Sequence, residues 1–356
     1  MTGVGLFLAF VVTVVFMFAL RPVAEATGLV DVPGGRKRHV GPVPLIGGIA
    51  MAVGLGFGGA VIEHPSFWDP TMLAVYLLVA VGTIDDRFDL PANVRLIAQT
   101  CACLIVVFAA DVVVKHLGAP FFFDLPLGPL AAPFTVLFIL TLINAFNVID
   151  GIDGLAGGLA LLALAGLAVI GADTPVWVLV MLLFAVVAGF LVFNLPLKVN
   201  RPVRAFMGDA GSTFLGLSIA CLGISLCQGE GAPMSPSVGL WLIAVPVFDL
   251  FAAVVRRVME GKSPFAPDHE HLHHVLIEQG LSRRVTLVVM LLLAAVYAAL
   301  GVAGNALAVP DGVMVLGWFG AFAFYYQLMR RPWVVVRAAN AVGLAGERAV
   351  AAARTR

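Results

Sequence analysis

Apolar segments of about 20 residues follow one another along nearly the whole of this chain. A segment of that length can span the hydrocarbon core of a bilayer as a helix, in which every backbone polar group is paired internally. The 356 residues are 61% hydrophobic and 12% charged, whereas roughly 25% of the residues in a soluble domain are charged. The sequence therefore predicts an all-α, polytopic integral membrane protein.

Eleven apolar segments qualify as membrane spans. The first has neither a basic leading segment nor a small-residue cleavage site, so we expect it to be retained rather than removed as a signal peptide. We predict a single transmembrane domain over residues 1–336, followed by a basic tail at 337–356. The predicted spans are 3–20, 44–62, 70–84, 96–114, 129–147, 154–171, 175–195, 210–227, 238–255, 285–303 and 312–329.

The positions of the basic residues predict the orientation, because Lys and Arg favour the cytoplasmic side of a membrane. With eleven spans and the N-terminus outside, Lys115 is the one residue among the 21 Lys and Arg that lies outside. Ten or twelve spans would place the Arg-bearing tail outside and break this agreement. We therefore predict an external N-terminus and a cytoplasmic C-terminus.

Carboxylates and histidines gather at span ends on the predicted cytoplasmic face. Ionisable residues in membrane proteins are costly and are therefore candidates for function. Carboxylate oxygens suit a hard divalent cation, and the basic residues of the same loops suit a phosphorylated substrate. The stretches concerned are GTIDDRFDLP with Asp85 and Asp86, NAFNVIDGIDGLAGG with Asp150 and Asp153, FMGDAGS with Asp209, and DHEHLHH with His271, His273 and His274.

Each stretch taken alone also has a purely structural interpretation. Asp85 and Asp86 fit a solvated helix end, and DGIDG fits a tight turn. The stretch GDAGS fits a helix N-cap in which Asp209 or Ser212 accepts hydrogen bonds from backbone amides. The case for a site at the membrane surface that handles phosphates and a metal therefore rests on the joint occurrence of these stretches.

Two further patterns leave alternatives open. If the chain is helical from Asn147 onward, Asp150 and Asp153 share a face with it and form an oxygen-rich lining for a ligand. Asp249 is the one acid well inside a span, and it fits an ion pair with Arg256 seven residues later. A secondary transporter or a cation channel is the distant alternative, since such proteins bind near the bilayer midplane between internal repeats.

Five motifs resemble those of the polyprenyl-phosphate N-acetylhexosamine-1-phosphate transferases, in the family's order. Within this family the sequence is similar to the WecA type. The MraY type typically carries three consecutive histidines and a lysine after the acidic pair. The resemblance implies eleven spans and a bacterial inner-membrane protein with a periplasmic N-terminus and an active site facing the cytoplasm. The motifs are RKRHVGPVPLIGG, DDRFDLP, NAFNVIDGIDGLAGG, FMGDAGSTFLG and SPFAPDHEHLHHVL.

The resemblance implies transfer of N-acetylglucosamine-1-phosphate from UDP-N-acetylglucosamine to undecaprenyl phosphate, with release of UMP. The product is the first lipid-linked sugar of a cell-surface polysaccharide such as O-antigen. Another UDP-amino sugar as donor is the nearer alternative. The implied cofactor is Mg²⁺, with Mn²⁺ as a substitute, and the implied partners are the two substrates and the lipid bilayer. A homodimer is compatible with the family, and no nucleic-acid partner is expected.

The family's metal site maps onto Asp209, with Asp85 and Asp86 as its acidic pair. Asp85 is also implied as the base that deprotonates the lipid phosphate. A phosphate monoester has a second pKa near 6 and is already largely dianionic at neutral pH, so direct attack is an equally economical alternative. The histidine motif, His271, His273 and His274, is implied to act beside the diphosphate or the sugar.

The remaining matching positions are implied to lie on the substrate side. Asp153 is the candidate for the uracil edge, and Phe206 for stacking on that base. The basic residues of the first cytoplasmic loop are weaker matches. The full set of substrate-side residues is Asn147, Asp150, Asp153, Phe206, Arg36, Lys37, His39, Asn194 and Asp249.

Overall fold

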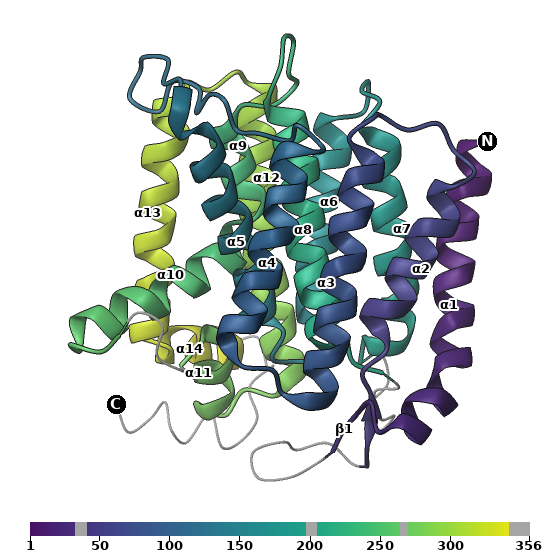
Figure 1. Ribbon diagram of the computed structural model, residues 1–356. Helices are drawn as coiled ribbons and strands as arrows, with labels where there is room; N and C mark the ends of the chain where they lie inside the picture. The colour runs from purple at the N-terminus through teal and green to yellow at the C-terminus, as the bar shows by residue number, and fades with distance from the viewer. Residues whose placement is uncertain (33–40, 197–204, 264–269, 342–356) are drawn as a thin grey trace.

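The computed structural model describes residues 1–32, 41–196, 205–263 and 270–341. Within these ranges fourteen α-helices pack into a bundle, with α1 at one edge and α13 at the other (Figure 1). The helices are α1 (Thr2–Thr27), α2 (Gly47–Gly59), α3 (Trp68–Phe88), α4 (Ala92–Phe108), α5 (Ala131–Ile149), α6 (Leu155–Ile170), α7 (Trp177–Asn194), α8 (Gly208–Cys227), α9 (Pro236–Leu242), α10 (Ala244–Met259), α11 (Leu272–Glu278), α12 (Arg283–Ala306), α13 (Asp311–Arg330) and α14 (Trp333–Ala341).

Two short elements complete the described structure. The 3-10 helix η1 (Gly128–Leu130) leads into α5. The strands β1 (Val30–Asp31) and β2 (Val43–Pro44) pair antiparallel, with Val30 opposite Pro44. This strand pair lies where α1 ends, and it directs the chain into α2 (Figure 1).

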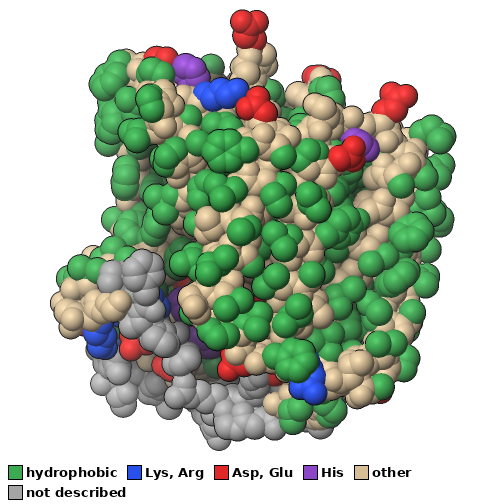
Figure 2. Space-filling view, viewed as in Figure 1, with side chains coloured by type: hydrophobic (Ala, Val, Ile, Leu, Met, Phe, Trp, Pro, Cys, Tyr) green, Lys and Arg blue, Asp and Glu red, His purple; other side chains and the backbone are tan. Residues whose placement is uncertain are grey.

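The surface of the bundle is that of a membrane protein. Hydrophobic side chains cover its flank, and charged side chains gather at its two ends (Figure 2). In the described part of the chain, six helices are long and apolar enough to cross a membrane, or seven if the bent pair α9 and α10 forms one span. The chain is therefore an all-helical, multi-span membrane protein. The six are α1, the η1–α5 segment, α7, α8, α12 and α13.

A helix lies at each of the eleven predicted span positions, but not every helix is a long apolar rod. The ninth is broken, because α9 and α10 meet at an angle of 83°. The helices α2, α4 and α6 have 13, 17 and 16 residues, which is shorter than the roughly 20 residues that a perpendicular span needs. The count of eleven spans and the orientation therefore stay predictions.

Helix α8 forms the centre of the bundle. Of its most apolar stretch, 83% is buried inside the protein, against 22% for α1. Glycines bring neighbouring backbones onto it: a Cβ on Gly82 of α3 would lie 2.5 Å from the Cα of Ala210, and a Cβ on Gly48 of α2 would collide with the backbone at Gly211. Small residues allow such close approach between membrane helices. The first turn of α8 is therefore held between α2 and α3.

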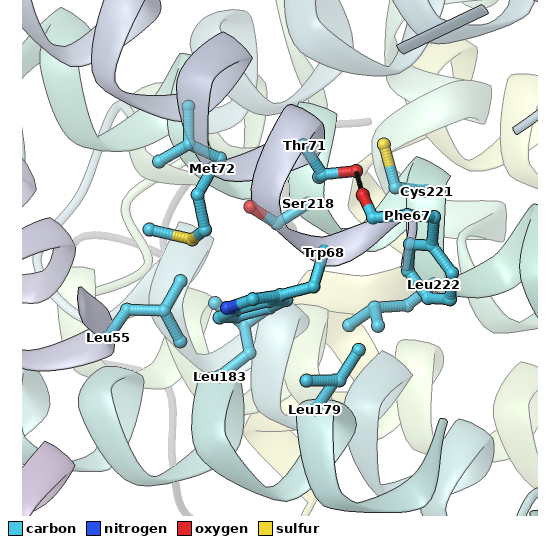
Figure 3. A pocket seen from close by; sticks show the side chains of 11 residues that line it. Leu55, Phe67, Trp68, Thr71, Met72, Leu179, Leu183, Ser218, Cys221 and Leu222 are labelled. Carbon is cyan, nitrogen blue, oxygen red and sulfur yellow. Dashed lines mark hydrogen bonds between the residues drawn. The ribbon is translucent and has the colours of Figure 1, made fainter. Parts of the chain in front are cut away.

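An apolar cavity lies near the other ends of α3 and α8 (Figure 3). Trp68, Leu183 and Ser218 are among the residues that line it, and its volume of about 10 Å³ is no more than one water molecule needs. The Ser218 hydroxyl is buried and has no hydrogen-bond partner within the described residues. We interpret this cavity as a packing void, because it is too small for a substrate.

Replacing Gly82 by Ala tests the packing of α3 on α8. The added methyl group has to displace the backbone of α8, so we expect the free energy of unfolding to fall by about 1–3 kcal/mol. The matched control is Gly223→Ala, also in α8, where a Cβ would meet no atom within 4 Å. Thermal unfolding in detergent should show a lower Tm for Gly82→Ala only, and equal Tm values for the two variants would contradict the packing described here.

Candidate active site

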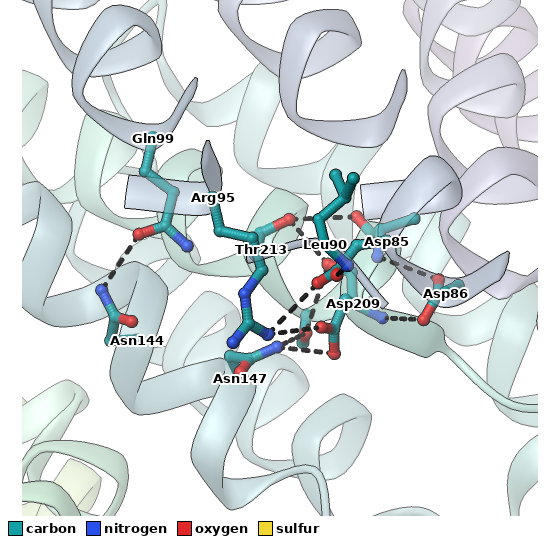
Figure 4. A network of polar contacts seen from close by, with 11 residues as sticks. Asp85, Asp86, Leu90, Arg95, Gln99, Asn144, Asn147, Asp209 and Thr213 are labelled. Atoms are coloured by element: carbon teal, nitrogen blue, oxygen red, sulfur yellow. Dashed lines mark hydrogen bonds and ion pairs between the residues drawn. The ribbon is translucent and has the colours of Figure 1, made fainter. Parts of the chain in front are cut away.

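Three helix ends meet at one end of the bundle and carry most of the polar residues picked out from the sequence (Figure 4). Asp85 and Asp86 lie in the last turn of α3, Asn147 in the last turn of α5, and Asp209 in the first turn of α8. Arg95 reaches into the same cluster from the first turns of α4. We call this cluster of five residues the acidic cluster.

Asp86 caps the start of α8. The amide N–H groups at the start of a helix have no partner within the helix and need an external acceptor. Here the N–H of Asp209 donates to Asp86 Oδ1 at 2.8 Å, and the N–H of Ala210 donates to Oδ2 at 3.3 Å. Gly208 adopts φ +71°, and a Cβ there would collide with the Asp86 carboxylate. The expected cap by Asp209 or Ser212 is therefore wrong, because α3 supplies the acceptor.

Asp209 is held from two sides. The side-chain amide of Asn147 donates to Asp209 Oδ1 at 2.9 Å and contacts the Ser212 hydroxyl at 3.1 Å. One guanidinium nitrogen of Arg95 lies 3.4 Å from Asp209 Oδ2 and 3.2 Å from Asp85 Oδ2. Arg95 thus bridges the carboxylates of α3 and α8 and offsets their mutual repulsion.

Asp85 is buried, so the interpretation of the acidic pair as a solvated helix end is wrong for this residue. Its Oδ1 accepts the N–H of Leu90 at 2.7 Å. Asp89 adopts φ +51° as the residue that ends α3, which folds the following turn back over the carboxylate. Together with Arg95, this turn occupies both oxygens of Asp85.

The segment between α5 and α6 is a turn rather than a helix, which confirms the turn interpretation and overturns the shared helical face of Asn147, Asp150 and Asp153. Gly154 adopts φ +81°, and its N–H donates to the side chain of Asn194 at 2.7 Å. The side chain of Asn194 in turn donates to the carbonyl of Ala205 at 3.0 Å. Asn194 is buried and holds two backbone segments together.

The turn places Asp150 close enough to the acidic cluster to be affected by its negative charges. Burial, followed by the negative charges of Asp209, Asp153 and Asp86, raises the pKa of Asp150 from 3.8 to about 7. Four carboxyl groups therefore repel one another here, and a divalent cation would offset that repulsion. Among the residues that the structure describes, no group of three or more His, Cys, Asp or Glu side chains has an arrangement that holds a metal ion.

The structure brings the three histidines of the HLHH motif together at the start of α11. The rings of His273 and His274 lie 4.1 Å apart, and those of His271 and His273 lie 6.0 Å apart and nearly parallel. His273 is fully buried, and burial is the largest of the effects that lower its pKa to about 3. Its Nε2 lies so close to Gly151 that a Cβ there would collide with it. The histidine motif therefore packs directly against the turn that carries Asp150.

Asp249 lies in α10 and is fully buried. Its Oδ1 accepts the N–H of Leu272 at 3.0 Å and the hydroxyl of Tyr325 at 2.7 Å. The expected ion pair with Arg256 is wrong, because the Arg256 guanidinium lies 3.3 Å from the carboxylate of Glu270 instead. Asp249 therefore contacts the histidine motif rather than the basic residue on its own helix.

Phe206 joins the first loop to the start of α8. Its N–H donates to the carbonyl of Pro44 at 2.9 Å, and its carbonyl accepts the N–H of Gly47 at 3.0 Å. These bonds place the LIGG stretch against FMGDAGS, two motifs far apart in the sequence. Three of the predicted substrate residues, Arg36, Lys37 and His39, lie outside the described residues.

Sequence reasoning missed two residues that hold the site together. From the sequence alone, Arg95 served only as one of the basic residues that predict the orientation. Its position ten residues after Asp85, in a short acidic loop, was an available signal that it pairs with the carboxylates. Tyr325 lies inside an apolar span, and nothing in the neighbouring sequence marks it. Its role emerges only from the contact between α13 and α10.

Comparison with known proteins finds relatives that align along most of the chain. Residues 70–227 match the family described as Glycosyl transferase family 4. The chain is 35% identical over 350 residues to the undecaprenyl-phosphate alpha-N-acetylglucosaminyl 1-phosphate transferase of Haemophilus influenzae, covering 94% of this chain and 95% of that protein. It is 35% and 36% identical to the proteins of that name from Escherichia coli K12 and Salmonella typhi, over 92% of this chain and 91% of each relative.

Asp150→Asn tests the field of the acidic cluster. The raised pKa means that the Asp150 carboxyl keeps its proton in the folded protein up to a pH of about 7, whereas in the unfolded chain it loses the proton near pH 4. The free energy of unfolding of the wild type therefore falls progressively as the pH rises between these values, and that of the Asn variant does not fall for this reason. Without divalent cations, the Tm of Asp150→Asn should rise relative to the wild type between these pH values. Parallel Tm curves would contradict the raised pKa.

Proposed function

The chain belongs to glycosyl transferase family 4, and on this basis we propose that it transfers N-acetylglucosamine-1-phosphate from UDP-N-acetylglucosamine to undecaprenyl phosphate. UMP is released, and a lipid-linked diphosphate sugar is formed. The single observation that carries the proposal is the acidic cluster at the end of a membrane bundle, in a chain that aligns along nearly its whole length with transferases of this name.

The location of the cluster suits these two substrates. Undecaprenyl phosphate is anchored in the bilayer by its hydrocarbon chain, whereas the nucleotide sugar is soluble. A reaction between them has to take place at the membrane boundary. The acidic cluster lies at one end of the bundle, where the hydrophobic flank gives way to charged side chains (Figure 2). We propose that this end faces the cytoplasm of a bacterial inner membrane.

The reaction is a phosphoryl transfer in which positioning and charge neutralisation matter more than covalent chemistry. An oxygen of the lipid phosphate attacks the β-phosphorus of the donor. The bond from that phosphorus to the bridging oxygen breaks, and the electron pair leaves with UMP. The contacts of Asp85 support direct attack, because its two oxygens already bind the Leu90 amide and Arg95. The lipid phosphate is largely dianionic at neutral pH and needs no base.

We propose that Mg²⁺ binds at Asp209, with Asp85 and Asp86 beside it. The donor set fits, because these are hard carboxylate oxygens. After burial, the negative charges of Asp209 and Asp86 help to raise the pKa of the neighbouring Asp150, as a site that attracts cations would. When bound, the cation would supply charge neutralisation for the diphosphate and the leaving UMP. The chain's own groups orient Asp209 from both sides, through the Asn147 amide and the Arg95 guanidinium.

On the donor side we propose that Asp153 binds the uracil edge and that Phe206 stacks on the base. Both residues lie in segments tied to the acidic cluster, since the turn that carries Asp153 follows α5 and Phe206 lies two residues before the start of α8. His273 lies against that same turn and stays neutral at pH 7, because its pKa is lowered to about 3. A neutral imidazole adds no positive charge beside the nucleotide.

The first test is UMP release by the purified protein, given undecaprenyl phosphate, Mg²⁺ and a panel of UDP-sugars. We expect release with UDP-N-acetylglucosamine, abolished by EDTA and reduced about 100-fold or more by Asp209→Asn, since loss of one preorganised electrostatic group costs that much. The matched control is Asp69→Asn, an exposed position at the far end of α3. Release with another UDP-amino sugar alone would change the donor, and no release from folded protein would overturn the proposal.

Asp153→Asn tests the donor-side assignment. Loss of a carboxylate at the uracil edge should raise the KM for the UDP-sugar about 10-fold and leave the KM for undecaprenyl phosphate within 2-fold, because the two substrates are held by different groups. Steady-state kinetics with each substrate varied in turn measures both constants. An equal rise in both KM values would remove Asp153 from the nucleotide site.

A further inference from the structure

The buried carboxylate of Asp249 raises a question of charge compensation. A carboxylate out of contact with water is costly unless it is paired and hydrogen-bonded. Within the described residues no Lys or Arg forms an ion pair with Asp249, and Arg256 on the same helix is paired with Glu270. Its partners are instead Tyr325 of α13, the first amide of α11, and the imidazole of His271.

We propose that Tyr325 and Asp249 are positioning residues for the proposed phosphoryl transfer and that they act through His271. The imidazole Nδ1 of His271 lies 2.7 Å from Asp249 Oδ2, and both side chains are almost wholly buried. Asp249 does not contact substrate in this inference, because its carboxylate is fully buried and both oxygens face protein groups. The proposal rests on the proposed function, since His271 belongs to the motif assigned to the donor's diphosphate or sugar.

The two oxygens of Asp249 have separate partners. Oδ1 accepts from the Tyr325 hydroxyl and the Leu272 amide, which leaves Oδ2 for His271. An acceptor on Nδ1 fixes the tautomer and the plane of an imidazole, so that Nε2 on the opposite edge of the ring is left for a substrate group. Because Leu272 directly follows His271, the same carboxylate fixes both the ring and the backbone that carries it.

Tyr325 connects this arrangement to the rest of the bundle. Its side chain is fully buried, and its ring packs on Phe248, the residue before Asp249, with centroids 5.8 Å apart. The hydroxyl therefore donates from a ring that cannot move freely. Removing only the hydroxyl would leave the ring packing intact and free Oδ1 from one of its two donors.

The His271 ring is also linked to the turn that carries Asp150. It lies nearly parallel to His273, with an interplanar angle of 9°, and His273 packs against Gly151. Among the residues that the structure describes, the other ionisable groups near His271 include His274 on the same helix and the pair Arg256–Glu270 beside it. A change in the orientation of His271 would therefore alter the packing of His273 and of the turn that contacts it.

The kinetic test compares Tyr325→Phe with its matched control Tyr297→Phe. Tyr297 also packs on Phe248, but its hydroxyl donates to the carbonyl of Ala321 at 3.4 Å and not to Asp249. We expect Tyr325→Phe to lower the kcat of UMP release about 3- to 10-fold, the effect of one hydrogen bond of ordinary strength, because the bond acts on the substrate only through Asp249 and His271. The KM for undecaprenyl phosphate should stay unchanged, and the Tm should fall by only a few degrees because one hydrogen bond to a buried carboxylate is lost. Tyr297→Phe should match the kcat of the wild type.

A second variant, Asp249→Asn, removes the acceptor of the His271 proton while keeping the side-chain shape. Loss of the correct tautomer should lower kcat about 100-fold or more. If this variant does not fold, the Tyr325→Phe pair still decides. Wild-type kcat in Tyr325→Phe, or an equal loss in both tyrosine variants, would overturn the inference.

Nitrogen-15 NMR spectra of the histidine side chains give a readout that does not depend on activity. The signal of His271 can be assigned by its loss in His271→Gln. In the wild type it should report a proton on Nδ1, and in Asp249→Asn this signature should be lost. An Nε2–H tautomer in the wild type would overturn the inference. An Nδ1–H signature in a protein that releases no UMP would instead count against the proposed function alone.

Discussion

The bond between the Asp86 carboxylate and the first amides of α8 is the constraint on which the site depends. It joins the end of one helix to the start of another across 123 residues of sequence. Because the capped amide belongs to Asp209 itself, the same contact fixes the position of the carboxylate proposed to bind the metal. The glycine packing of α3 against α8 brings the two helices close enough for this cap to form.

The sequence could predict where the helices lie and which end carries the chemistry. Apolar length located every long helix, and the acids at span ends gathered as expected at one end of the bundle. The bend between α9 and α10 was not predicted, because LWLIAVPVF was interpreted as one apolar segment, although its Pro246 is an available signal for a kink. The partners of these charged side chains could not be predicted either, since Asp86, Asp249 and Arg95 bind groups on other helices. Pairings of that kind are set by tertiary packing rather than by local pattern.

Two kinds of negative charge coexist at this end of the protein. Asp249 is fully buried among a tyrosine, a backbone amide and a histidine. Within the described residues one guanidinium, that of Arg95, contacts the carboxylates of the acidic cluster, so the carboxyl groups of Asp86, Asp209, Asp150 and Asp153 still repel one another. The first arrangement gives rigidity, and the second gives affinity for cations and for the phosphates they accompany.

The cap on α8 also bears on how such a chain can diverge. A side chain of α3 sets the position of Asp209. The lengths of the connections among α4, α5, α6 and α7 therefore do not determine that position. Insertions and deletions in the turns at the opposite end, such as the one between α6 and α7, would leave the register of the two helices unchanged. Relatives of this protein can therefore differ freely in those turns, while a one-residue shift at the junction of α3 and α8 would dismantle the site.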